Sequence, residues 1–459
     1  MPLLEGAGLT GVLASGNKTT HFGSPSEYLE VIDSRTQAKY ILPIVNNSVK
    51  AADLGSIKAL DETLNHSQQS APGLKVFDRG FTNTACVESA ITFIDGEEGK
   101  IKFRGYDIEY LYDNHDYEEV IHLLIWGHLP SNEEKQSLRE RLLAELKTPQ
   151  SVVDAIRAFP PQSSTGSMIL AGLAAFAALD EGTKKLHSQA EPYYIGNMKN
   201  TDAAIIRTLA AIATTIALVY CHKRGKTFTE PSLEGSFISN VLKMMGREDK
   251  GIEKCLERLW ILYADHEMTN STAAFLHASS TLTDPLSSSI SAIVSAYGPL
   301  HGGAIDLAYQ EFKAIASVKH VPYLIKEVKA KRQRLFGFGH RIYKTVDPRT
   351  KFIREMIDEQ VRNPLRSRVP LLEIALEIER IASTDDYFIS RRLAANADLY
   401  GALLYTALGF ESDIIVAMAS LSRVPGPMAH WRESMQQKPM LWRPQQLYRE
   451  GSKIGFPRG

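Results

Sequence analysis

From about residue 117 onward, apolar residues recur every three to four positions, and glycine or proline stands at many of the breaks. This spacing gathers apolar side chains on one side of a helix and therefore predicts helices that are amphipathic or buried. The predicted helices cover about 117–127, 132–147, 150–158, 166–180, 201–223, 233–246, 251–265 and 270–297. Such a succession of helices, with no strand pattern between them, predicts a mainly α fold.

Strand patterns are confined to the first part of the chain. Residues 28–32 and 40–45 predict a strand pair, and a Ser-, Gln- and Pro-rich link follows at 67–72. The stretch ITFIDGEEGKIKF, residues 91–103, predicts a hairpin because β-branched and aromatic residues flank a glycine-containing turn. We therefore expect an N-terminal extension over residues 1–75, short N-terminal β hairpins, and a helical body after them.

Length and charge limit the organisation of the chain and its partners. A chain of 459 residues is long enough for two domains, or for one large domain that carries a smaller one. Its formal net charge is -1 at pH 7, so no overall basic field draws it to nucleic acid or to anionic lipid. We expect neither a nucleic-acid nor a membrane partner, and an anionic ligand would have to be held by locally placed cations.

The usual signatures of metals and nucleotide cofactors are missing from the sequence. The three cysteines form no CxxC pair, which excludes a disulfide framework and argues against structural zinc. No GxxxxGK[ST] motif occurs, and a GxGxxG match at residues 6–11 has too few residues before it for the strand of a dinucleotide fold. We expect no metal and no resident cofactor.

The two ends of the sequence carry no evident targeting signal. The N-terminal stretch MPLLEGAGLTGVLASGNKTTHFG lacks a basic or sustained apolar segment, and the C-terminal Pro-Arg-Gly is neither a peroxisomal nor a retrieval signal. The apolar stretch Ala203–Tyr220 is interrupted by Arg207, so it predicts a buried helix rather than a membrane span. We expect a cytoplasmic protein.

Three histidines stand in unusual settings: His266 in LYADHEMTNST, His301 in YGPLHGGA and His340 in RLFGFGHRIYKTVDPR. A single histidine near an apolar helix is more often a core or capping residue than a catalyst. Glycines flank His301 and His340, however, and glycine lets the backbone approach a ligand closely. Arg349, in a rigid Asp-Pro-Arg turn after His340, adds the guanidinium that binding of an α-keto carboxylate requires.

The blocks LYADHE, GPLHGGA, GFGHRIYKTVDPR, NADLYG and RPQQLY together resemble the citrate synthase family. FTNTACVESAITFIDGEEGKIKFRGYDIEYL resembles its N-terminal region, above all in bacterial-type members, and the whole resemblance runs from about residue 28 to about 450. The family includes 2-methylcitrate synthases and fungal-type alkylcitrate synthases. The resemblance implies the citrate synthase fold, an all-α homodimer with a large helical domain (76–302 and 409–459) and a small helical domain (303–408). It also implies Claisen condensation of an acyl-CoA with oxaloacetate, followed by thioester hydrolysis.

The resemblance implies catalytic roles for three residues. His301 matches the histidine that hydrogen-bonds the thioester carbonyl and stabilises the developing enol, a task that requires a neutral donor. Asp398 matches the base that removes the α-proton of the acyl-CoA. His340 matches the residue that polarises the oxaloacetate ketone and protonates its oxygen as the carbon-carbon bond forms.

The same resemblance implies the substrate contacts. Arg349, Arg423 and Arg443 match the arginines that hold the carboxylates of oxaloacetate, the last reaching in from the partner subunit. His266 and His340 would add hydrogen bonds to oxaloacetate. Coenzyme A would lie along the loop 335–340, with contacts at Arg334, Gly337, Phe338, Gly339 and Lys344.

The sequence departs from the family pattern beside the expected base. The usual NVDFYSG is NADLYG here, and a phenylalanine that usually stands four residues before the arginine equivalent to Arg423 is replaced by alanine. The four positions that are smaller than usual are Ala397, Leu399, Gly401 and Ala419. A large-to-Ala change costs about 2–5 kcal/mol unless something fills the space, and a longer acyl chain could fill it. We therefore hypothesise an enlarged acyl pocket, as in an alkylcitrate synthase.

Other interpretations of the sequence remain open. Enlarged side chains elsewhere could fill the space, which would leave an ordinary acetyl-CoA citrate synthase, and a 2-methylcitrate synthase that uses propionyl-CoA lies between these two enzymes. A catalytically silent relative that binds oxaloacetate or CoA belongs to another functional class. The joint presence of His301, His340 and Asp398 argues against it.

Overall fold

The computed structural model describes residues 27–58, 73–186, 188, 192–362 and 371–447, and the chain divides into two compact units, Met1–Glu88 and Ser89–Gly459. In the first unit, β1 (Tyr28–Ile32) and β2 (Lys39–Pro43) pair antiparallel, and a short helix α1 (Ala51–Leu54) follows. The predicted strand pair is thereby confirmed. The link predicted at 67–72 lies outside the described residues.

The second unit begins with a small antiparallel sheet. Its strands β3 (Thr92–Asp95), β4 (Lys100–Phe103) and β5 (Tyr106–Asp107) are paired in that order, and Thr92 lies opposite Phe103. The side chain of Asp95 closes the turn between β3 and β4, because its Oδ1 accepts from the backbone N–H groups of Glu97 and Glu98 at 2.9 Å each. The hairpin predicted from ITFIDGEEGKIKF is confirmed.

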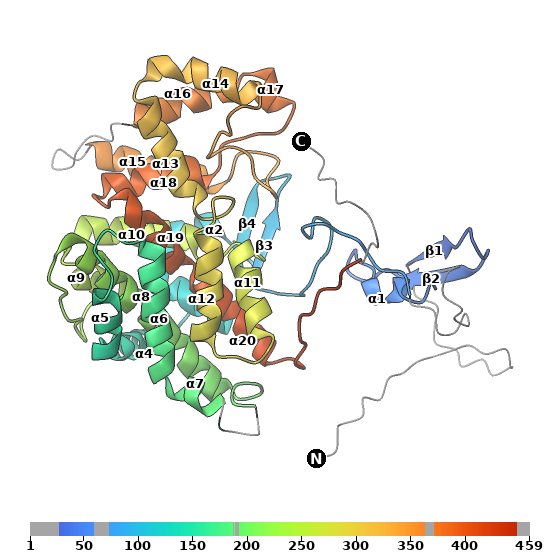
Figure 1. Ribbon diagram of the computed structural model, residues 1–459, viewed down its shortest axis with the longest axis horizontal. Coiled ribbons are helices and arrows are strands. Elements are labelled where there is room, and N and C mark those ends of the chain that lie inside the picture. Colours follow the sequence, from blue (N-terminus) through green and yellow to red (C-terminus); the bar gives the residue numbers. More distant parts are fainter. Residues whose placement is uncertain (1–26, 59–72, 187, 189–191, 363–370, 448–459) are drawn as a thin grey trace. The chain divides into compact units, whose positions relative to one another are not determined.

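The rest of this unit is helical, as Figure 1 shows, and the mainly α prediction is confirmed. The helices are α2 (Ile108–Asn114), α3 (Tyr117–Trp126), α4 (Asn132–Glu145), α5 (Gln150–Arg157), α6 (Thr165–Leu179), α7 (Glu181–Leu186), α8 (Met198–Arg224), α9 (Phe237–Met244), α10 (Lys250–Tyr263), α11 (Asn270–Ser279), α12 (Pro285–Ala296), α13 (Ala304–Ile315), η1 (Val318–His320), α14 (Val321–Lys329), α15 (Arg349–Arg362), α16 (Leu372–Ala382), α17 (Asp386–Ile389), α18 (Ala397–Ala407), α19 (Ser412–Arg423) and α20 (Pro425–Met435).

The long helix α8 lies at the centre of the helical packing and contacts α4, α6, α9, α19 and α20. Its residues Ile205, Leu209, Ile212 and Ile216 are at most 1% exposed. By length and composition α8 is apolar enough to cross a membrane, but 94% of its most apolar window is buried inside the protein. Its apolar surface is therefore covered by neighbouring helices, as predicted for 203–220.

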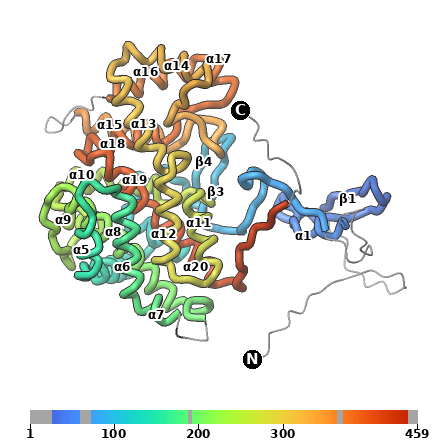
Figure 2. Tube along the Cα trace, viewed as in Figure 1, coloured from blue at the N-terminus to red at the C-terminus, as the bar shows by residue number. Residues whose placement is uncertain are grey.

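One group of helices gathers at one end of this unit, at the top of Figures 1 and 2. There α13 and α15 both pack against α18, and α14 packs against α16. This group falls within residues 303–408, the predicted small domain. The division of the helical body into this domain and a larger one (76–302 and 409–459) stays a prediction.

One predicted helix is wrong. The apolar pattern over 270–297 predicts a single helix, but the structure has two, α11 and α12, separated by a short break. Leu282 has a φ of 68° in this break, and Pro285 takes the first helical position of α12. Proline cannot donate the backbone hydrogen bond of a helix interior, and Asp284 caps the new start by accepting from Ser287 N at 2.8 Å.

Candidate active site

Two backbone segments far apart in sequence lie side by side, one leading to His340 and the other to Asp398. Gly339 N donates to Ala394 O at 2.8 Å, and Asn396 N donates to Gly337 O at 3.0 Å. Gly337 and Gly339 have φ values of 80° and 78°, which L side chains rarely adopt, and a Cβ at Gly337 would lie 2.9 Å from Leu399 Cα. The glycines flanking His340 are therefore required by the close approach of this loop to the start of α18.

Asp398 lies in the first turn of α18, which begins after Asn396. The side chain of Asn396 caps the helix: its Oδ1 accepts from Asp398 N at 3.0 Å, while its Nδ2 donates to Gly339 O at 2.9 Å. Burial raises the pKa of the Asp398 carboxyl to about 6, although the positive charges of Arg349 and Arg423 favour its ionised form. The carboxylate is thus ionised at neutral pH and more basic than an ordinary aspartate.

His301 follows α12 and reaches the N-terminus of α11. Its Nε2 lies 3.3 Å from the backbone N of Ser271 and 2.8 Å from the Ser271 Oγ. A backbone N–H can only donate, so Nε2 must be an acceptor and the ring proton is on Nδ1. Burial and the positive charge of Arg423 lower the pKa of His301 to about 4, so the ring is neutral at physiological pH.

His340 is neutral too, but it carries its proton on the other nitrogen. The backbone N–H groups of Ile342 and Tyr343 both donate to its Nδ1, at 3.1 and 3.3 Å, which places the proton on Nε2. Burial and the charge of Arg349 lower the pKa of His340 to about 4. Its ring lies 5.3 Å from the ring of His266, centroid to centroid.

His266 is buried beside His340 and fixed by a tyrosine. Its Nε2 is 2.8 Å from the hydroxyl of Tyr343, and burial together with the charges of Arg349 and Arg423 holds the pKa of His266 well below its usual value. The structure therefore brings together the two histidines that the sequence placed near oxaloacetate.

Two arginines make the centre of the site electropositive. Arg349 is buried and forms a paired contact with Asp347, from Nε to Oδ1 at 2.9 Å and from Nη2 to Oδ2 at 2.6 Å. Burial opposes the charge of Arg349, but Asp347 outweighs it and raises the pKa of the guanidinium. Arg423 donates from Nε to the backbone O of Tyr263, and burial and repulsion from Arg349 lower its pKa to about 10. Among the described residues, the ion pair recorded for these two cations is the one between Arg349 and Asp347, and two buried cations with this single ion pair suit an anionic ligand.

The remaining predicted contact residues lie at the edges. Arg443 is exposed in the segment after α20, and among the described residues no recorded contact joins it to the histidines. Arg334 is exposed with its guanidinium over the ring of Phe336, and Lys344 is exposed with Nζ 3.4 Å from Arg341 O. A cavity of about 360 Å³ lies beside the glycine loop, and Phe338 and Lys344 are among its lining residues.

The four positions of the hypothesised acyl pocket differ in their surroundings. Ala397 and Leu399 are buried and Ala419 is partly buried. At Gly401 the space that a side chain would take is occupied, because an added Cβ would lie 2.6 Å from the Tyr263 hydroxyl and 3.0 Å from Ile305 Cδ1. The enlarged acyl pocket as a whole stays a prediction.

Sequence reasoning missed three residues that shape this site. Asp347 pairs with Arg349 and also accepts from Ala397 N at 3.2 Å; Ser271 fixes the tautomer of His301; Tyr263 lies between Arg423 and Gly401. The signals in the sequence were the tyrosine of LYADHE, the Asp-Pro-Arg turn and the Ser/Thr-rich helix start after LYADHE, and none of them indicates which distant residue its side chain contacts.

Comparison with known proteins identifies the class. Residues 80–445 match the family model described as "Citrate synthase, C-terminal domain", which covers more than half of the chain. The chain belongs to the citrate synthase family, and the resemblance predicted from the sequence is confirmed.

Its relatives include a citrate synthase-like protein and an alkylcitrate synthase. A "Citrate synthase-like protein" of Phoma sp. is 44% identical over 425 residues, covering 92% of this chain and 90% of the relative. An "Alkylcitrate synthase" of a fungal species is 37% identical, covering 93% of this chain and 94% of that protein. Among solved structures, the Thermoplasma acidophilum citrate synthase in ternary complex with carboxymethyl coenzyme A and oxaloacetate has a TM-score of 0.75. The two proteins are 28% identical, and the matched region covers 83% of this chain and 98% of the Thermoplasma chain.

Proposed function

We propose that this protein condenses an acyl-CoA with oxaloacetate and hydrolyses the resulting thioester, giving citrate or an alkylcitrate and free CoA. The observation that carries the proposal is the protonation state of three groups. His301 and His340 are both neutral and can each donate one proton, while Asp398 is ionised at neutral pH and has a raised pKa of about 6. Enolisation followed by carbon-carbon bond formation needs two neutral donors and one base.

In the first step, we propose that the carboxylate of Asp398 removes a proton from the α-carbon of the acyl-CoA. The electron pair moves into the thioester carbonyl, whose oxygen accepts a hydrogen bond from Nδ1–H of His301. The low pKa of His301 leaves the ring uncharged at neutral pH, and a neutral imidazole can donate this hydrogen bond from Nδ1.

In the second step, the enol carbon attacks the ketone of oxaloacetate, and Nε2–H of His340 gives its proton to the ketone oxygen, which becomes the hydroxyl of the product. Water then cleaves the thioester, leaving a carboxylate and CoA thiol. Arg349 and Arg423 supply the positive charge for the oxaloacetate dianion, and His266 is buried beside the ring of His340.

For coenzyme A we propose the loop that ends at His340. The cavity of about 360 Å³ beside this loop is lined mainly by apolar residues, with Lys344 and Arg392 among its polar ones. This composition suits an adenine ring with phosphates at the edge. The contacts proposed at Gly337, Phe338 and Gly339 rest on the match of this loop to the coenzyme A loop of the family.

We further propose that the preferred donor is longer than acetyl-CoA, which would make the protein an alkylcitrate synthase. Small side chains at Ala397 and Ala419 and the alkylcitrate synthase among the relatives support this proposal. Acetyl-CoA and propionyl-CoA are the competing donors. The packing of Tyr263 into the space at Gly401 favours them, because it removes one route for a longer chain.

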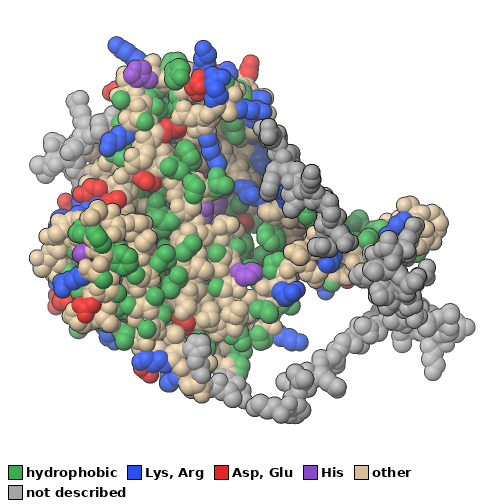
Figure 3. Space-filling view, in the orientation of Figure 1, with side chains coloured by type: hydrophobic (Ala, Val, Ile, Leu, Met, Phe, Trp, Pro, Cys, Tyr) green, Lys and Arg blue, Asp and Glu red, His purple; other side chains and the backbone are tan. Residues whose placement is uncertain are grey.

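A homodimer with shared sites is part of the proposal. The neighbouring helices α6, α11 and α12 contain no Asp, Glu, Lys or Arg, and Val294 and Leu300 are 55% and 79% exposed. On the face shown in Figure 3, charged side chains lie mostly near the margins and uncharged ones cover the middle. Such a surface suits a partner subunit, which would supply Arg443 to the neighbouring site.

We also propose a cytoplasmic enzyme that needs no resident cofactor.

The decisive experiment is release of CoA thiol by the purified protein with oxaloacetate and a series of acetyl-, propionyl-, hexanoyl- and longer acyl-CoAs, with product mass measured in parallel. The highest kcat/KM with six or more carbons is the expected result. The highest value with acetyl-CoA or propionyl-CoA would make the protein a citrate or 2-methylcitrate synthase. Absence of thiol release with every donor would refute the condensation and favour a silent relative.

The shared site has its own test in subunit complementation. Arg443→Ala and Asp398→Asn are each expected to be inactive alone. When the two are co-expressed, a mixed dimer has one site with both residues intact, so random pairing should restore about a quarter of the wild-type activity. No recovery in purified mixed dimers would show that Arg443 does not act across the interface.

A further inference from the structure

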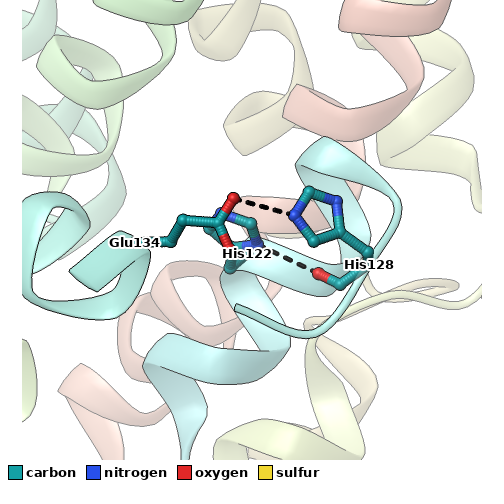
Figure 4. A group of neighbouring side chains, drawn as sticks. All are labelled: His122, His128 and Glu134. Carbon is teal, nitrogen blue, oxygen red and sulfur yellow. Dashed lines mark hydrogen bonds and ion pairs between the residues drawn. The ribbon is translucent and has the colours of Figure 1, made fainter. Parts of the chain in front are cut away.

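A histidine- and carboxylate-bearing cluster lies at the junction of α3 and α4. His122 is in the middle of α3, His128 is in the connecting loop, and Glu134 is in the first turn of α4. One donor atom from each residue lies within 4.8 Å of the donor atoms of the other two. Figure 4 shows the three side chains converging from the two helices and the loop between them.

Hydrogen bonding fixes the orientation of His122. Its Nδ1 is 3.0 Å from the backbone O of His128, and since a carbonyl oxygen only accepts, Nδ1 carries the proton. In the neutral ring the lone pair is therefore on Nε2, for which no hydrogen bond to the described residues is recorded. Metal-binding histidines are held in the same way, with the second ring nitrogen donating to a carbonyl or carboxylate.

Glu134 is held from the opposite side. Its Oε2 accepts from Ser131 N at 2.8 Å as part of the capping box of α4, and its Oε1 is 3.0 Å from Nε2 of His128. The capping bond leaves Oε1 directed at the histidine, so the carboxylate is oriented before any ion arrives.

The separations match the needs of a small divalent ion. Zinc ligands lie about 2.0–2.2 Å from the metal, so two ligands of a tetrahedral site are about 3.3 Å apart. The His128–Glu134 pair already lies at 3.0 Å, and both side chains are about half exposed, at 56% and 45%, so they can turn toward buried His122. Solvent would then complete the fourth position.

We propose that His122, His128 and Glu134 form a Zn²⁺ site that joins α3 to the start of α4. Two imidazoles and one carboxylate are typical zinc ligands, whereas Ca²⁺ and Mg²⁺ need a set made mostly of oxygen atoms. The site lies outside the proposed catalytic groups: among the described residues, no recorded contact joins the cluster to His266, His301 or His340. The expectation of no metal rested on the absence of a CxxC pair and of histidines at metal-ligand spacing in the sequence, and this proposal departs from it because the fold brings His122, His128 and Glu134 together.

The test is calorimetric titration of the tag-free, metal-free full-length protein with Zn²⁺, alongside a Co²⁺ titration that reports tetrahedral coordination through its visible absorption. We expect one such ion per chain, with affinity at least about tenfold weaker in His128→Ala and in Glu134→Gln. The amide of the Glu134→Gln variant would keep an oxygen for the capping bond to Ser131, so helix α4 is expected to remain folded. Glu133→Gln, which removes a neighbouring exposed carboxylate, is the matched control and should bind as the wild type does.

Two results would overturn the proposal. One is the absence of zinc binding by a folded protein. The other is binding that His128→Ala and Glu134→Gln leave unchanged, which would assign the ion to other groups, such as the histidines of the candidate active site. Replacement of His266 by alanine separates that case, because it should weaken zinc binding only if the ion is held by the histidines of the candidate active site.

Discussion

Gly401 offers a direct test of whether the small residues beside Asp398 form a pocket or complete a packed core. In Gly401→Ala the new methyl carbon would lie 2.6 Å from the Tyr263 hydroxyl and 3.0 Å from Ile305 Cδ1. Contacts between such atoms normally lie at about 3.5–4.0 Å, so both neighbours would have to move. Overpacking of this kind costs about 1–3 kcal/mol, and we expect that loss in the free energy of unfolding.

The same structure predicts which second change relieves the strain. Tyr263→Phe removes the hydroxyl that the methyl group would meet, but it also removes the hydrogen bond from that hydroxyl to Ala397 O at 3.3 Å. That loss alone should cost about 0.5–1.5 kcal/mol. The double variant should therefore be more stable than the sum of the two single effects predicts, with a coupling energy of about 0.5–3 kcal/mol.

The assay is urea unfolding of the wild type, both single variants and the double variant, together with kcat/KM for short and long acyl-CoAs. Packing predicts that Gly401→Ala lowers stability and affects all donors alike. A variant of wild-type stability that loses only the longer donors would refute this reasoning, because it would show that residue 401 borders the acyl chain.

Three further predictions concern the proposed base and the anion site. Asp398→Asn should keep oxaloacetate binding, measured by calorimetry, but lose at least about a hundredfold in kcat. The pKa of Asp398 lies near 6 in the folded protein and near 3.8 in the unfolded chain, so ionisation of this carboxyl opposes folding. The Asn variant should therefore be more stable than the wild type above pH 6. This gain should fade as the pH falls toward 4, as measured by denaturation of both proteins over a pH series. Arg349→Ala should weaken oxaloacetate binding strongly and leave Asp347 buried without its partner, so both affinity and melting temperature should fall, whereas Arg354→Ala, in the same helix but exposed, should change neither by much.

The sequence predicted the helices better than their ends. Periodicity located α8 and α10 within a few residues, because burial of one face depends on spacing that the sequence displays directly. It failed at α11 and α12, where Pro285 begins a new helix inside an unbroken apolar pattern. The short helix α7 was also missed, since Glu181–Leu186 has too few turns to show a period.

The site was predicted in its residues but not in its contacts. The sequence indicated His301, His340, Asp398 and the arginines. Asp347 and Tyr263 lie within the same motif blocks, but their contacts became visible only through distances between segments far apart in the chain. Asp347, for example, accepts from Ala397 N across a sequence separation of 50 residues. A short motif carries no information about such a pair, because the pairing depends on how the intervening helices pack.

The two proposed donor histidines show how much of the chemistry depends on the backbone around a residue. Both are flanked by glycines in the sequence, yet the Ser271 N–H at the start of α11 occupies Nε2 of His301, while loop N–H groups after His340 occupy its Nδ1. The two rings therefore present opposite nitrogens, Nδ1–H and Nε2–H, to their substrates.

The same surroundings set the pH range in which His301 and His340 are neutral and Asp398 is ionised. The histidines are neutral above about pH 4, and Asp398 is ionised above about pH 6, so the carboxylate alone determines the lower limit. We therefore expect kcat to rise with pH through about 6 and to show no second acidic transition from the histidines. In Asp398→Glu this acidic limb should move, because it belongs to the carboxyl at position 398. A limb near pH 6.5, about the ordinary pKa of histidine, that stays at the same pH in this variant would contradict the assignment.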